Sequence, residues 1–150
     1  MKKIIFILTV AFFAANCTKT NETEDLNLKD LNLALSVEMS SSSVENTPSN
    51  ISLLIGELTD RLFNAEEHSS ENIYIKNVDG SLQIKITETG SSEIPDFAGK
   101  PCAEQSTRCY SRECVKTTLE SILGDGKRDV IIKYERNLTN VLISWQYQDC

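Results

Sequence analysis

VIIKYERNLTNVLISWQY, residues 130–147, is the stretch that decides the fold. Apolar and polar side chains alternate on both sides of its polar centre, residues 137–140. The apolar positions are Val130, Ile132, Tyr134, Val141, Ile143, Trp145 and Tyr147. Because successive side chains of a strand point to opposite faces, this spacing places the apolar positions on one face. The sequence therefore predicts a β-hairpin with one buried face.

An amphipathic helix is predicted directly before this hairpin. Ser111 is a residue type that favours the N-cap of a helix, and Gly124 is one that favours its end. Between them, apolar side chains recur at helical spacing at Val115, Leu119, Ile122 and Leu123. The two elements together form a helix–hairpin unit.

The same kind of unit occurs earlier in the chain. Thr47-Pro48 is typical of an N-cap followed by proline at the first helical position, and it predicts a helix that ends at about Ala65. Apolar and polar residues then alternate over residues 73–86. This alternation is interrupted by Asp79-Gly80, a dipeptide that favours a tight hairpin turn. We therefore expect a second hairpin here.

A further strand is predicted before the first helix. Apolar side chains alternate from Leu31 to Met39, and Ser40 to Ser43 break the pattern. The predicted order is strand, helix, hairpin, helix, hairpin. This order is typical of an α+β fold in which an antiparallel-rich sheet carries both helices on one face. Two arrangements are compatible with it: the split βαβ order of ferredoxin-like folds with one added strand, or a tandem repeat of the helix–hairpin unit.

No predicted element accounts for residues 89–110. Loops of this length inside a compact domain are uncommon, and many of them are functional. We interpret the segment as a loop that contacts a protein partner, and the alternative is a surface insertion with no partner. The candidate partner-binding residues, including one that follows the loop, are Phe97, Lys100, Arg108, Tyr110 and Arg112.

Four cysteines lie in the second half of the chain: Cys102, Cys109, Cys114 and Cys150. An even number of cysteines in an exported chain favours two disulfides, for which three pairings exist. We favour Cys102 with Cys109 and Cys114 with Cys150, because the second pair would anchor the C-terminus to the last helix. A zinc site is the competing interpretation. It is disfavoured because the spacings lack a C-x2-C pair and the expected compartment is oxidising.

The first seventeen residues are typical of an export signal. Lys2 and Lys3 precede an apolar run over residues 4–15, which is too short to span a bilayer as a mature helix, and Cys17 follows. This pattern resembles the signal of a bacterial lipoprotein. The resemblance implies that residues 1–16 are removed and that Cys17 is acylated and holds the protein to the membrane. Residues 17–29 would then form a flexible tether, and residues 30–150 a single small domain.

Location follows from the same resemblance. Thr18 follows the cysteine in place of the Asp that signals inner-membrane retention, so the resemblance implies an outer-membrane lipoprotein. Cleavage after Cys17 by an ordinary signal peptidase would instead give a secreted protein. In a secreted eukaryotic protein, Asn21, Asn50 and Asn137 would be possible glycan acceptors.

Charge argues against nucleic acid as a partner. Without Lys2 and Lys3, 13 basic and 22 acidic side chains remain, so the mature net charge is −9. The charge is uneven. Residues 17–99 hold 5 basic and 15 acidic side chains, whereas residues 100–150 hold 8 and 7. An anionic ligand would therefore be drawn to the second half of the chain.

Motifs for catalysis are missing from the sequence. It has no glycine-rich phosphate loop, no G-x-S-x-G and no H-E-x-x-H, and its one histidine, His68, follows the first helix in a polar segment. We therefore expect no metal, no cofactor and no enzymatic activity. The function we expect is a lipid-anchored binding protein of the cell envelope, of an inhibitor or immunity type. The alternatives are a structural or assembly accessory of the outer membrane and a small hydrolase with two carboxylates.

Overall fold

The computed structural model describes residues 41–91 and 95–150. Its elements are β1 (Ser41–Glu45), α2 (Pro48–Asn64), β2 (Ser70–Val78), β3 (Ser81–Glu88), β4 (Gln105–Cys109), α3 (Arg112–Leu123), β5 (Val130–Arg136) and β6 (Val141–Tyr147). The predicted signal peptide, the tether and the predicted strand Leu31–Met39 lie outside the described residues.

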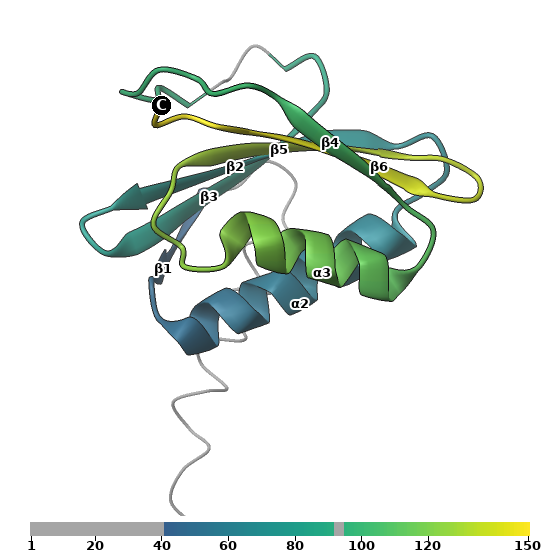
Figure 1. Ribbon diagram of the computed structural model, residues 1–150, viewed down its shortest axis with the longest axis horizontal. Helices are drawn as coiled ribbons and strands as arrows, with labels where there is room; N and C mark the ends of the chain where they lie inside the picture. Colours follow the sequence, from purple (N-terminus) through teal and green to yellow (C-terminus); the bar gives the residue numbers. More distant parts are fainter. Residues whose placement is uncertain (1–40, 92–94) are drawn as a thin grey trace, which may run out of the picture.

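The strands form one six-stranded sheet in the order β1-β3-β2-β5-β6-β4, and every neighbouring pair is antiparallel. Both helices lie side by side on the same face of this sheet (Figure 1). The core fills the space between the two layers and contains the fully buried Leu58, Leu62, Val115 and Leu119 of the helices. The predicted α+β class is confirmed.

Two units of the same topology build the sheet. In β1-α2-β2-β3, strand β3 lies between β2 and β1; in β4-α3-β5-β6, strand β6 lies between β5 and β4. The registers match as well, because Val44 pairs with Leu82 in the first unit and Cys109 with Val141 in the second. The tandem repeat is therefore correct, with a strand added before each helix. The ferredoxin-like alternative is wrong because β4 precedes α3 and because β5 pairs with β2.

Both hairpins and both helix starts are as predicted. The Thr47 hydroxyl accepts a hydrogen bond from Asn50 N (3.3 Å), and the Ser111 hydroxyl accepts one from Cys114 N (3.2 Å), so each residue caps its helix. Positive φ angles at Asp79 (50°) and Gly80 (82°) turn the first hairpin.

Strands β1 and β4 differ from the predictions. Ser40 to Ser43 were expected to break the strand pattern, but β1 begins at Ser41, where it pairs with Lys85 of β3. Residues 89–110 were expected to form a loop throughout, but Gln105–Cys109 pair with β6. Both strands are sheet edges, five residues long and mainly polar. Pairing with a hydrophobic neighbour forms them, because their own apolar content is too small to predict a strand.

Candidate functional site

Strand β4 is the centre of the candidate site. It is the last strand of the sheet, so one side of its backbone pairs with β6, from Gln105 opposite Trp145 to Cys109 opposite Val141. Its Gln105, Ser106 and Arg108 are exposed. An edge strand presents unpaired backbone N–H and C=O groups on its outer side, and such groups can bind another chain.

Two disulfides hold β4 at its two ends. Cys102 is joined to Cys150 (Cα–Cα 5.2 Å), and Cys109 is joined to Cys114 (Cα–Cα 5.3 Å). Backbone hydrogen bonds reinforce the first link: Cys102 N donates to Tyr147 O and Cys150 N donates to Lys100 O, both at 2.9 Å. We call residues 102–114, with both disulfides, the β4 edge.

The predicted pairing of the cysteines is wrong, although the prediction of two disulfides is confirmed. Because β4 is extended, its first and last residues, Gln105 and Cys109, are separated by roughly 13 Å, at about 3.3 Å per residue, and Cys102 lies beyond the Gln105 end. A disulfide needs Cα atoms within about 7 Å. Cys114 instead lies in the first turn of α3, close to the end of β4. The antiparallel β6 carries Cys150 back to the start of β4.

The turn that the Cys109–Cys114 disulfide closes presents an aromatic residue to solvent. Tyr110 is 68% exposed. Beside it, the Arg112 guanidinium donates to Asp60 Oδ1 of α2 (2.7 and 2.9 Å), which ties the turn to the first unit. Arg108 is exposed and forms no ion pair with any residue in 41–91 or 95–150. Tyr and Arg, together with Trp, are the residue types enriched at binding hot spots.

The five candidate partner-binding residues do not form one cluster. Arg108, Tyr110 and Arg112 lie together at one end of the β4 edge. Phe97 instead packs against Tyr74 of β2, with ring centroids 6.3 Å apart, and Lys100 lies beyond the other end of β4. Phe97 therefore covers part of the sheet face on which Tyr74 lies. Only the first three residues are placed to contact one partner surface together.

A partly buried charged cluster lies between α2, β2 and β5. Arg61 donates to Glu71 through both Nε (2.8 Å) and Nη2 (2.7 Å), and Tyr134 Oη donates to Glu71 Oε2 (2.8 Å). Burial and the hydrogen bond to Glu71 raise the pKa of Tyr134 well above its ordinary value. The hydrogen bond from Arg61 to Glu71 likewise raises the pKa of Arg61. These groups satisfy one another, so we interpret the cluster as structural.

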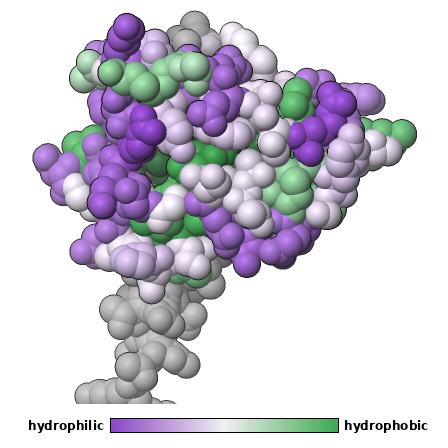
Figure 2. Space-filling view, viewed as in Figure 1, coloured by the Kyte–Doolittle hydropathy of each residue, from purple (hydrophilic) through white to green (hydrophobic). Residues whose placement is uncertain are grey.

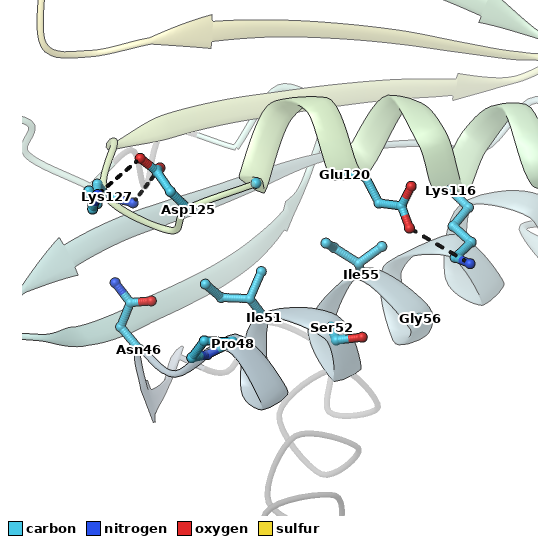
Figure 3. A pocket seen from close by; sticks show the side chains of 11 residues that line it. Asn46, Pro48, Ile51, Ser52, Ile55, Gly56, Lys116, Glu120, Asp125 and Lys127 are labelled. Carbon is cyan, nitrogen blue, oxygen red and sulfur yellow. Dashed lines mark hydrogen bonds and ion pairs between the residues drawn. The ribbon is translucent and has the colours of Figure 1, made fainter.

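A groove of about 600 Å³ separates the start of α2 from the end of α3. Ile51 and Ile55 point into it from α2 (Figure 3). On the α3 side, Lys116 pairs with Glu120 (3.7 Å) and Lys127 with Asp125 (3.6 Å). In the view of Figure 2, hydrophobic residues gather in a recess near the middle of the surface, and mostly hydrophilic residues surround them. The charged side chains on the α3 side pair with each other, and Ile51 and Ile55 line the α2 side. The groove therefore offers mainly apolar contact to a ligand.

Residues 41–91 and 95–150 contain neither a metal-binding group of side chains nor a helix that could cross a membrane. No group of three or more His, Cys, Asp or Glu side chains there is placed to hold a metal ion. His68 is exposed, and its backbone N donates to Arg136 O (2.7 Å). Within the same ranges, no helix is both long enough and apolar enough to cross a membrane.

Comparison with known proteins identified no relative. No family model matches the chain, and no match was found among curated proteins or solved structures. Function is therefore argued from the geometry above.

Proposed function

We propose that this protein is a lipid-anchored binding protein of the cell envelope, and that it recognises a protein partner through the β4 edge. The export signal and Cys17 motivate the anchor, and the two disulfides agree with an oxidising compartment. The observation that carries the recognition surface is Tyr110, which is exposed to solvent in a turn closed by the Cys109–Cys114 disulfide.

Rigidity favours binding by this turn. A loop that is ordered before association loses less conformational entropy when its partner arrives. The disulfide fixes the backbone on both sides of Tyr110, and the solvent-exposed Arg112–Asp60 ion pair adds a contact with α2. A large aromatic side chain on a fixed backbone supplies contact area at low entropic cost.

Charge narrows the type of partner. Arg108 brings a positive charge that no described carboxylate neutralises, next to a neutral aromatic ring. We therefore expect the partner to offer an apolar recess for Tyr110 and a carboxylate for Arg108. No described strand covers the outer edge of β4, so this edge can add main-chain hydrogen bonds to an extended segment of that partner.

Photo-crosslinking in the native host tests this proposal. A photoreactive amino acid at Tyr110 is expected to give one covalent adduct, with the same protein each time. The matched control is Leu138, which is exposed to the same degree (67%) in the β5–β6 turn. In parallel, Tyr110→Ala should abolish co-purification of that protein, whereas Leu138→Ala should leave it intact. The proposal fails if both positions give the same adducts, or if Tyr110 gives none.

A further inference from the structure

Two facing stripes of residues line the groove between α2 and α3. On α2 they run from Pro48 to Gly56, and on α3 from Lys116 to its C-cap, Gly124. The start of α2 lies beside the end of α3, so the two stripes follow each other along the groove (Figure 3). At about 1.5 Å per residue, each stripe is about 12 Å long. The groove is therefore elongated, and its volume of about 600 Å³ lies in the range of small-molecule sites.

Gly56 leaves space in this groove at a cost to the helix. It lies in the interior of α2, where glycine is the least favourable residue apart from proline. A Cβ at Gly56 would meet no atom within 4 Å, apart from its chain neighbours and the nearby backbone of its own helix. Its φ angle is not positive, so the backbone conformation does not require glycine either. The effect of glycine at this position is to keep a side chain out of the groove.

The wall of the groove has no net charge and no buried polar group in need of a partner. Two lysines and two carboxylates line it, and they pair with each other. Among the described residues, the buried side-chain polar atoms without a partner belong to Ser42, Asn72, Thr87 and Arg136, and none of these residues lines the groove. A ligand that lies inside the groove therefore has apolar contact to gain and few hydrogen bonds to make.

Peptide occupants fit this wall poorly. An extended peptide carries an N–H and a C=O group at almost every residue, and these groups would lose water in an apolar groove without gaining partners. A partner helix needs a broad apolar surface on which to lay its own apolar face. Among residues 41–91 and 95–150, however, the large hydrophobic side chains that are exposed are Tyr110 and Leu138, and neither lies at the groove. The apolar surface is thus confined to the groove itself.

A hydrocarbon chain matches the groove in shape and in chemistry. It is linear, it carries no backbone polar groups, and it is thin enough to lie between two helices. We infer that the groove binds one acyl chain of a lipid, with the lipid head group outside in water. None of residues 102–114 lines the groove, so this site is separate from the β4 edge. Tyr110→Ala should therefore leave acyl binding unchanged, and either proposal can fail without the other.

NMR titration of the full chain, produced without acyl groups, tests this inference. Butanoate, octanoate and dodecanoate are the probes, each below its critical micelle concentration, because they share a carboxylate and differ only in chain length. We expect them to shift the backbone amides of Ser52, Gly56 and Glu120, with an affinity that rises by up to about fourfold for each added methylene. Lauroyl lysophosphatidylcholine carries the dodecanoyl chain on another head group and should shift the same amides. Binding of dodecanoate alone would assign recognition to the carboxylate and overturn the inference.

Gly56→Leu is the diagnostic variant. Its side chain takes the space of several methylenes of the ligand, so it should weaken dodecanoate binding by at least about tenfold. It should also keep or raise the thermal midpoint, because leucine favours a helix more than glycine does. Thr117→Leu is the matched control, since Thr117 is exposed on α3 and does not line the groove. This variant likewise adds a leucine to a helix surface, and it should keep the wild-type affinity.

Wild-type affinity in Gly56→Leu would overturn the inference, as would the absence of shifts with dodecanoate or an affinity that does not depend on chain length. Shifts of the same amides on raising the protein concentration alone would also overturn it, because a second copy of the chain would then cover the groove. If Gly56→Leu fails to fold, Gly56→Ala gives a second test, since one methyl group fits the open space. A loss of about fourfold in its affinity for dodecanoate would support the inference, and wild-type affinity would count against it.

Discussion

Cys102 and Cys150 are joined by a disulfide that lies three residues before β4 and three residues after β6. Because these two strands are antiparallel neighbours, the start of one lies beside the end of the other. The Cys109–Cys114 disulfide then holds the opposite end of β4. The edge strand next to the proposed recognition turn is thus fixed at both ends.

Removing the disulfides one at a time should show which of the two links contributes more to the free energy of unfolding. In the chain-entropy model, loss of the Cys102–Cys150 link, which spans 48 residues, costs about 4 kcal/mol. Loss of the Cys109–Cys114 link, which spans 5 residues, costs about 2 kcal/mol. Urea unfolding of the paired Cys→Ser variants measures both values. If the variant without the shorter link is the less stable, the assignment of the longer link as the main stabiliser is wrong.

The β4 edge shows why the sequence predicts one part of this fold better than another. In β6, Val141 and Ile143 are fully buried, and the alternation of apolar residues in the sequence predicts the strand. In β4, the core-facing positions are Thr107 and Cys109, and the sequence pattern there is barely distinguishable from a polar loop. The strand depends on β6, which is remote in sequence. Missing β4 also led to the wrong disulfide pairing, because the prediction placed all four cysteines without an extended segment between Cys102 and Cys109.

The same dependence on neighbours hides the candidate sites. Tyr110 and the two arginines beside it are visible in the sequence, and their spacing predicts proximity. The separation of Phe97 from them is set by its contact with Tyr74, which lies more than twenty residues earlier.

The junction between the two repeated units should be sensitive to loss of core packing. Ile73 of β2 lies opposite Ile132 of β5, and both side chains are fully buried. Ile132→Ala should lower the free energy of unfolding by about 3 kcal/mol, because it removes buried methyl groups and leaves a cavity. Ile131→Ala is the control, since Ile131 points to the other face and is only partly buried. An equal loss in both variants would contradict the two-layer core.

Stability should fall in alkaline solution, and Tyr134 should account for part of the fall. Burial and the hydrogen bond to Glu71 raise the pKa of Tyr134 above the value of about 10 that the unfolded chain has. Above about pH 10 the Tyr134 hydroxyl loses its proton more readily in the unfolded state than in the folded state. The contribution of Tyr134 to stability is therefore complete below about pH 10 and is lost as the pH rises further.

Urea unfolding measures this effect at about pH 9 and about pH 11, on either side of the ordinary tyrosine pKa. The midpoint should drop for the wild type and drop less for Tyr134→Phe, which has no proton to lose. Tyr147 has a pKa raised by burial as well, so some alkaline loss should persist in the variant. The same drop in both proteins would show that the Tyr134 proton does not contribute.

Intact mass of the protein from its native host decides whether the folded domain is anchored. We predict a chain from Cys17 to Cys150 that carries acyl groups, because the signal resembles that of a bacterial lipoprotein. On reduction the mass should rise by about four hydrogens, two for each disulfide. A chain that begins at Thr18 without lipid would instead make this a secreted protein, and partners would then have to be sought outside the cell. A mass unchanged by reduction would remove the disulfides that fix Tyr110, and with them the reason to place recognition at the β4 edge.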